Sequence, residues 1–265
     1  MFKKKRIVLS IILVFLVSVL SFWGFVSRHY VVPILMYHSI NPKTNPVMKA
    51  LIVSPNTFER QMRFLREQDY NIMPLESLAE LMRGNKKLPH KAVAVTFDDG
   101  YRDFYKYAFP LLKKYKIPAT MFIIVDEVGR PDRLSWDEIK EMQASGLITC
   151  GSHSMGAEPL INISSEDELK RQIFYSKKVL EGKLECPINM FSYPEGFLDK
   201  HIRELVVGAG YKLAVSTKTG NCYSAQDLFA LKRVRISESA GNLLYLWAKV
   251  SGYHAFFKDS KKRCR

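Results

Sequence analysis

Thr96-Phe97-Asp98-Asp99-Gly100 continues the apolar run Ala92-Val93-Ala94-Val95. The run has the composition of a buried strand, and Gly100 is typical of the turn that follows one. The motif therefore puts two adjacent carboxylates at the C-terminal end of a strand, where ligands and catalytic groups gather in α/β folds. Two neighbouring carboxylates are costly unless a cation or a proton compensates them. One can bind a cation while the other acts as a general base, although Asp-Asp-Gly is also common in solvated turns.

Strand-like and helix-like segments alternate along the chain, which predicts parallel strands joined by crossover helices. The strand-like segments are residues 33–37, 92–97, 119–125, 147–151, 189–193 and 213–216. Helical spacing of apolar residues marks 57–68, 75–82, 136–143 and 243–250, and a capping box at Ser165 and Glu168 opens a further helix that extends to about Leu184. No internal repeat or interdomain linker interrupts this alternation, so one α/β domain is expected.

The N-terminus is predicted to be a membrane anchor. Lys3-Lys4-Lys5-Arg6 precedes an uncharged apolar segment at residues 7–26. This segment has the length of a bilayer's hydrocarbon core, and its flanking cations favour a cytoplasmic N-terminus with the remainder outside. A cleaved signal peptide is the alternative interpretation. Phe22, Trp23 and Phe25 stand where small residues would mark a cleavage site, which favours the anchor, and both interpretations export the domain.

The charge and cysteine content limit the partners. The formal net charge of +14 falls to +10 when the four predicted cytoplasmic cations are set aside. A basic exported domain suits an anionic envelope, and its export argues against nucleic acid as a partner. Cys150, Cys186, Cys222 and Cys264 are widely dispersed, with no spacing typical of a metal knuckle. An exported location permits a disulfide whose pairing the sequence does not determine.

Residues 96–100 resemble the first motif of the polysaccharide deacetylases, the NodB-type domains of carbohydrate esterase family four. Ile-Leu-Met-Tyr-His at 34–38 resembles the opening strand of the branch that contains poly-β-1,6-N-acetylglucosamine deacetylases. Gly-Ser-His-Ser at 151–154, Phe-Ser-Tyr-Pro-Glu-Gly at 191–196 and Leu-Lys-Arg-Val at 231–234 follow in the family's order. The resemblance covers roughly residues 32–255 and implies a distorted, incomplete (β/α) barrel. The expected organisation is 1–28 as basic flank and transmembrane anchor, 29–257 as the deacetylase-like domain and 258–265 as a basic tail.

The resemblance also implies roles for individual residues. Asp98 would be the general base, and His38 would be the acid that protonates the leaving amine. Asp99 and His153 would be ligands of a divalent metal ion, which in this family is expected to be zinc, with cobalt or nickel as alternatives. The substrate implied is an N-acetylated polysaccharide of the envelope or the extracellular space. Amide hydrolysis requires these functions because water must be activated, the carbonyl polarised and the departing amine protonated.

The second motif departs from the family pattern. Family members carry a second metal-binding His four residues after the first, or five in the glucosamine-polymer branch. Here Ala157 stands at the first of these positions and Glu158 at the second, while Leu160 keeps its usual spacing. A catalytic metal normally has three protein ligands. Glu158 is therefore a candidate third ligand, because a carboxylate is an acceptable donor, and the alternative is that it is an exposed turn residue.

The later motifs supply candidate substrate-binding residues. Tyr193, Pro194 and Gly196 fall in the motif that lines the floor of the site in the family, with Ser192 in place of the usual Arg and Glu195 in place of an aromatic residue. Arg233 is a candidate for the missing cation beside Asp98. The alternative is that residues 193–194 only end a strand and Arg233 is a surface charge.

Two functional hypotheses remain open at this stage. The first is a membrane-anchored, metal-dependent N-deacetylase with an altered metal site. The second is a degenerate member of the family that binds glycan or partners without turnover, as the missing second His suggests. A serine hydrolase of the Gly-x-Ser-x-Gly type and a nucleotide enzyme with a Gly-rich phosphate loop are disfavoured, because the chain contains neither motif.

Overall fold

The computed structural model describes residues 12–19, 21, 24, 31–43, 50–84, 86–217 and 227–253. The chain divides into two units, Met1–Val31 and Val32–Arg265. In the first unit residues 12–19 are helical. Within the described residues, no helix combines the length and apolar character needed to cross a membrane. The predicted span at 7–26 lies partly outside the described residues, and the predicted tail at 258–265 lies entirely outside them.

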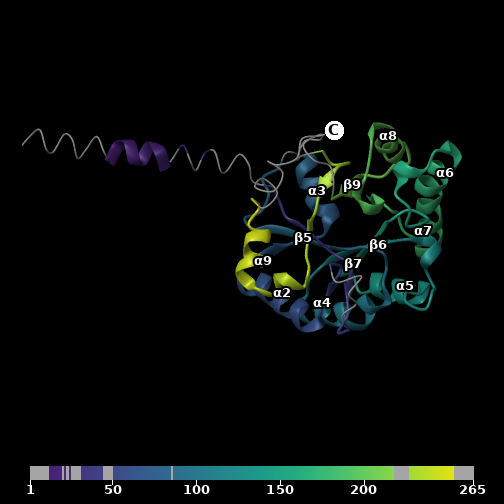
Figure 1. Ribbon diagram of the computed structural model, residues 1–265, viewed down its shortest axis with the longest axis horizontal. Coiled ribbons are helices and arrows are strands. Elements are labelled where there is room, and N and C mark those ends of the chain that lie inside the picture. The colour runs from purple at the N-terminus through teal and green to yellow at the C-terminus, as the bar shows by residue number, and fades with distance from the viewer. Residues whose placement is uncertain are drawn as a thin grey trace, which may run out of the picture. The chain divides into compact units, whose positions relative to one another are not determined.

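The second unit is built on a nearly closed, parallel, barrel-like sheet surrounded by helices (Figure 1). Its strand order is β10-β9-β8-β7-β6-β5-β1-β11, with β4 paired to β5. The bounds are β1 Ile34–Tyr37, β4 Asn71–Ile72, β5 Ala92–Phe97, β6 Ala119–Ile123, β7 Ile148–Ser152, β8 Met190–Ser192, β9 Leu213–Ser216, β10 Leu231–Lys232 and β11 Val234–Arg235. A separate parallel pair joins β2 Ser39–Ile40 to β3 Ile52–Val53.

One short segment holds both ends of this sheet. β10 pairs with β9, with Leu231 opposite Val215, whereas β11 pairs with β1, with Val234 opposite Leu35. Only Arg233 separates β10 from β11. Residues 231–235 therefore pair with β9 at one side of the sheet and with β1 at the other. Arg233, between the two short strands, lies where the barrel closes.

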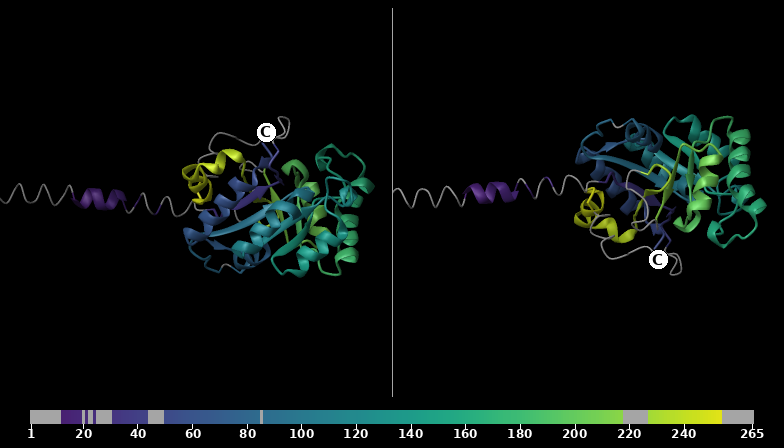
Figure 2. Two further views of the ribbon diagram at one scale, coloured as in Figure 1. Left: turned by 90° about the horizontal axis from the view of Figure 1, so that it is seen from below. Right: turned by 90° about the horizontal axis from the view of Figure 1, so that it is seen from above.

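The helices form where the sequence supplies caps and apolar faces. The main helices are α2 Pro55–Glu67, α3 Leu75–Arg83, α4 Phe109–Tyr115, α5 Trp136–Ala144, α6 Glu166–Lys170, α7 Ser176–Leu184, α8 Lys200–Gly208 and α9 Leu243–Val250. In α2 the Ser54 side chain accepts from the backbone of Thr57, and Phe58, Met62 and Leu65 are buried. Figure 2 shows the helices on the outside of the sheet from two further directions.

An aromatic cluster supports the strand ends that matter for the site. The rings of Tyr37 and Phe97 stack with centroids 5.2 Å apart, and Phe104 meets Phe97 edge-on at 4.6 Å. The Tyr37 hydroxyl donates to Gln61 of α2 at 2.9 Å. All three aromatic side chains are fully buried. His38 and Asp98 directly follow Tyr37 and Phe97 in the chain. The packed aromatic cluster therefore fixes the backbone from which both side chains extend.

The predicted alternation of strands and helices is confirmed, as is the barrel-like architecture. All six predicted strands form, within two residues of their expected ends, and the helix expected at 243–250 is α9. The helix that begins after Ser165 reaches Leu184 as expected, but a π-helical turn, η4 Arg171–Tyr175, interrupts it. Ser165 caps Glu168, whereas the reciprocal capping box occurs at Ser135 and Glu138 instead. The two-residue strands, α4 and α8 were not predicted.

Candidate active site

The two carboxylates at the end of β5 lie in different environments. The Asp98 backbone N–H donates to the Tyr37 carbonyl at 3.1 Å, and its side chain is buried. Asp99 has a φ of 70°, and Gly100 follows with a φ of 66°. A left-handed conformation is uncommon for a residue with a side chain and is often found at functional sites. The turn thus directs two consecutive carboxylates into the same region of the domain.

Asp98 forms a bidentate ion pair with Arg233. Nη1 and Nη2 of Arg233 each lie 2.6 Å from one carboxylate oxygen, and both side chains are nearly inaccessible to solvent. Burial raises the pKa of Asp98, but the positive charge of Arg233 and the proximity of His153 more than offset burial and lower this pKa to about 2. Asp98 is therefore a carboxylate at neutral pH, as a general base must be.

Arg233 is also held by hydroxyl groups of two other strands. Nη1 donates to Oγ1 of Thr96 at 3.3 Å, and Nη2 donates to Oγ of Ser192 at 2.9 Å. The expectation that Arg233 lies beside Asp98 is confirmed, and the alternative of a surface charge is wrong. The role of Ser192 was not predicted, although its place in a motif that usually contains Arg was a signal.

His153 follows β7 and faces both carboxylates. Its Nδ1 lies 2.7 Å from the Ser192 carbonyl, to which it donates, so Nε2 is the nitrogen left unprotonated in the neutral ring. Nε2 lies 3.5 Å from Oδ1 of Asp99 and 3.9 Å from Oδ2 of Asp98. Burial lowers the pKa of His153, but the charges of the two carboxylates outweigh burial and raise it above its ordinary value.

His38 follows β1, next to β5 in the sheet. Burial lowers its pKa below the ordinary value, and the charges of Asp98 and Asp99 oppose burial. Its Nδ1 is buried and has no hydrogen-bond partner in the described part of the chain. A buried polar nitrogen without a partner is costly, and a catalytic role is one explanation for such a group. His38 thus shares an electrostatic environment with both carboxylates.

The residues of the third motif do not all face this centre. Tyr193 is fully buried, and its hydroxyl donates to the Phe229 carbonyl at 3.0 Å. Pro194 is also buried. Gly196 has a φ of 78°, and a Cβ atom there would lie 2.1 Å from Oγ1 of Thr217, so only glycine fits. The Tyr193 side chain therefore packs in the interior, and Gly196 permits a close approach of two backbone segments.

Glu158, the candidate third ligand, is exposed on the turn after β7, as is Ala157. No cluster of three or more His, Cys, Asp or Glu side chains in the described ranges is arranged to hold a metal ion. Two residues nevertheless fit a metal centre. The Nδ1–H of His153 is fixed on a backbone carbonyl, which is the usual second contact of a metal-binding imidazole, and Nε2 faces the Asp99 carboxylate.

The comparisons with known proteins point to one family. A family model described as polysaccharide deacetylase matches residues 85–214. The Bacillus subtilis (strain 168) protein YxkH, named for the same family, is 31% identical over 217 residues, which are 82% of this chain and 75% of that protein. The poly-beta-1,6-N-acetyl-D-glucosamine N-deacetylase of Staphylococcus aureus (strain MSSA476) is 28% identical over 220 residues, 78% of this chain and 74% of that enzyme.

A solved structure shows the same relationship. The Streptococcus pyogenes deacetylase PplD in complex with acetate superimposes with a TM-score of 0.72 and 31% identity, covering 82% of this chain and 97% of that one. The chain belongs to the polysaccharide deacetylase family, whose members named here are hydrolases acting on carbon–nitrogen bonds.

Replacing Ser192 tests whether the contacts around Arg233 stabilise the fold. Ser192→Ala leaves one N–H of a buried guanidinium without its acceptor, so we expect the free energy of unfolding to fall by about 1–3 kcal/mol. Ser239 is exposed and its hydroxyl bonds to the hydroxyl of Ser237, so Ser239→Ala should change stability by less than about 0.5 kcal/mol. Urea unfolding of the full-length chain measures both. Equal effects of the two substitutions would contradict this account of Ser192.

Proposed function

We propose that this domain removes N-acetyl groups from an N-acetylated polysaccharide of the cell envelope or extracellular matrix. One observation carries the proposal: Arg233 keeps Asp98 ionised beside Asp99 and His153, at the C-terminal ends of β5 and β7 of one parallel sheet. The substrate class follows from family membership and from the Staphylococcus aureus relative, which is named for a β-1,6-linked N-acetylglucosamine polymer.

Each residue has a proposed role in this reaction. Asp99 and His153 would hold a divalent ion, zinc or alternatively cobalt or nickel, which supplies activation of water and polarisation of the amide carbonyl. Asp98 accepts the proton of the attacking water, because Arg233 keeps its carboxylate ionised and fixes its orientation. His38 donates a proton to the amine as the carbon–nitrogen bond breaks, and the products are acetate and a free amine.

The direct test is acetate release from an oligomer of β-1,6-linked N-acetylglucosamine. Asp98→Asn should lower the rate at least about 100-fold, because a general base contributes on this order or more. Asp167 is an exposed carboxylate on α6, so Asp167→Asn should leave the rate unchanged. A wild-type chain that releases no acetate, or an Asp98→Asn variant as active as the wild type, would contradict the proposal.

The altered second motif gives a separate prediction about metal binding. If Glu158 is the third ligand, Glu158→Ala should abolish binding of zinc, because two protein ligands do not hold a catalytic ion in a fixed place. Ala157→His restores the family's usual ligand and should preserve or raise metal content. Elemental analysis of the purified full-length protein measures both effects.

The same measurement distinguishes the non-catalytic alternative. The wild type would then bind no zinc, cobalt or nickel, and Glu158→Ala would change nothing. Ala157→His would create binding where none existed. That combination of results would contradict the enzyme hypothesis and favour a family member that binds glycan without turnover.

We further propose that residues 7–26 anchor the chain in a membrane, with the domain outside the cytoplasm. The cationic flank Lys3–Lys4–Lys5–Arg6 and the length of the uncharged run support this topology. Protease added to intact cells should digest the domain, whereas protection would contradict the topology. A released form that lacks the apolar segment would identify it as a signal peptide.

A further inference from the structure

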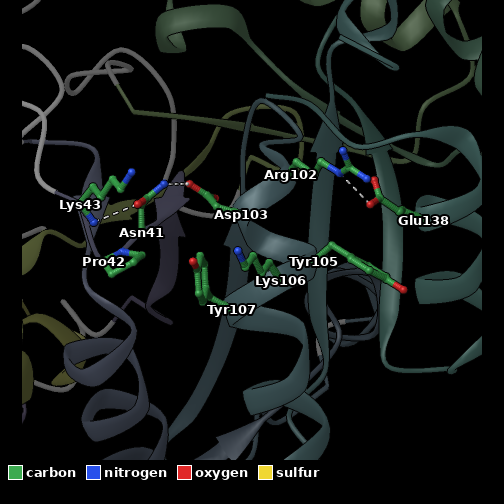
Figure 3. Close-up of a pocket in the computed structure, with 9 residues that line it drawn as sticks. All are labelled: Asn41, Pro42, Lys43, Arg102, Asp103, Tyr105, Lys106, Tyr107 and Glu138. Carbon is green, nitrogen blue, oxygen red and sulfur yellow. Dashed lines mark hydrogen bonds and ion pairs between the residues drawn. The ribbon is translucent and has the colours of Figure 1, made fainter. Parts of the chain in front are cut away.

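A pocket of about 620 Å³ lies between the segments that follow β2 and β5 (Figure 3). Asn41 and Lys43 line it on one side, and residues 102–107 contribute the other side. His38 stands three residues before Asn41, and Asp99 stands three residues before Arg102. The two segments that line the pocket therefore begin three residues after His38 and Asp99 in the chain.

Asp103 ties the two sides together. Its Oδ2 accepts from Oγ of Ser39 at 2.5 Å and from Nδ2 of Asn41 at 3.3 Å, while Oδ1 accepts from the backbone N–H of Ile40 at 3.2 Å. These three contacts occupy the carboxylate with neutral donors. Asp103 thus forms a fixed link between the two walls of the pocket.

The charged side chains of the lining give the pocket a positive formal net charge, because Lys43, Arg102 and Lys106 outnumber Asp103 and Glu138. Glu138 accepts from Nε of Arg102 at 2.9 Å and from the backbone N–H of Ser135 at 2.9 Å, so its charge is compensated. Lys43 and Lys106 are exposed, and neither forms an ion pair with any residue in the described part of the chain. Two ammonium groups on facing walls, neither paired with Asp103 or Glu138, are therefore available to attract an anion.

The pocket also has surfaces that suit a sugar ring. Tyr107 is half-buried, and the Lys106 ammonium lies 5.2 Å from the centroid of its ring. The Tyr105 hydroxyl donates to Glu141 at 2.6 Å, which fixes that ring. Figure 3 shows Lys106 and Tyr107 side by side below Asp103. A tyrosine ring offers an apolar face for the C–H groups of a sugar, and nearby polar groups orient its hydroxyls.

We propose that this pocket binds a carboxylate-bearing sugar of the polysaccharide, and that Lys43 and Lys106 select it. The proposal rests on the proposed function only in taking the ligand to be the substrate polymer. A neutral N-acetylglucosamine unit offers the ammonium groups only uncharged acceptors, whereas the carboxylate of a uronic acid can form an ion pair with one or both. The pocket thereby favours acidic glycans over neutral polymers of the same length.

Binding of two defined probes tests the proposal on the full-length protein in non-ionic detergent. The acidic probe is a hexasaccharide of hyaluronan, in which N-acetylglucosamine alternates with glucuronate, and the neutral probe is chitohexaose. Calorimetric titration at low salt should show at least about fivefold tighter binding of the acidic probe, from two contacts of modest strength each. High salt should reduce this preference by screening.

Matched variants assign the preference to the pocket. Lys43→Gln/Lys106→Gln should bind the two probes with equal affinity, whereas Lys43→Arg/Lys106→Arg should keep the preference. Lys140 and Lys178 are exposed lysines outside the pocket. The double variant Lys140→Gln/Lys178→Gln removes the same charge and should behave as the wild type.

Three results would overturn the proposal: no preference in the wild type, a preference that survives in Lys43→Gln/Lys106→Gln, or an equal loss in Lys140→Gln/Lys178→Gln. Because titration needs no turnover, the outcome is independent of acetate release. A chain that selects the acidic probe but releases no acetate would refute deacetylation alone. A chain that deacetylates without selecting the acidic probe would refute the pocket's role alone.

Discussion

The ion pair between Arg233 and Asp98 connects the closure of the barrel to its chemistry. Burying two charges costs several kcal/mol per ion, and only good geometry with further hydrogen bonds offsets this cost. Both conditions are met here, because the pair is bidentate at 2.6 Å and Arg233 also donates to Thr96 and Ser192. Arg233 lies between β10 and β11, which pair with opposite ends of the sheet. Closing the sheet therefore brings the cation to Asp98.

The same constraint extends to the imidazole. Ser192 accepts from Arg233 through its hydroxyl and from His153 through its carbonyl. Ser192, at the end of β8, thus fixes both Arg233, which orients Asp98, and the His153 ring, which faces Asp99. His38 completes the group from β1, the strand that pairs with both β5 and β11. The side chains at the ends of β5, β7 and β8 are therefore joined to Arg233, either directly or through one intermediate residue.

The sequence was informative where a single motif carried the signal. The strand at 92–97 and the paired carboxylates that follow it were predicted because apolar composition and Asp-Asp-Gly are local features. His153 and Arg233 were assigned by resemblance, and the structure brings both of them to Asp98. Metal binding and the role of Glu158 stay predictions.

Features that depend on distant pairing were not predictable. Strands β10 and β11 have two residues each, which is too short for a periodic pattern. The closure of the sheet could therefore be recognised only from the strand order of the structure. The double role of Ser192 and the link from Asp103 to residues 39–41 join segments that are far apart in sequence. Tyr193 lies in a motif that suggested substrate contact, yet packing placed its side chain in the interior. Such outcomes are set by tertiary context rather than by local propensity.

A double-mutant cycle between Asp98 and Arg233 tests the central claim most directly. Urea unfolding of the full-length chain would compare Asp98→Asn, Arg233→Met and the double variant. Each single change leaves an unpaired polar or charged group in the interior, so each should destabilise by about 3–5 kcal/mol, and the double variant should be more stable than their sum by at least about 2 kcal/mol. Effects that add within about 0.5 kcal/mol would show that the two residues do not depend on each other and would contradict the account.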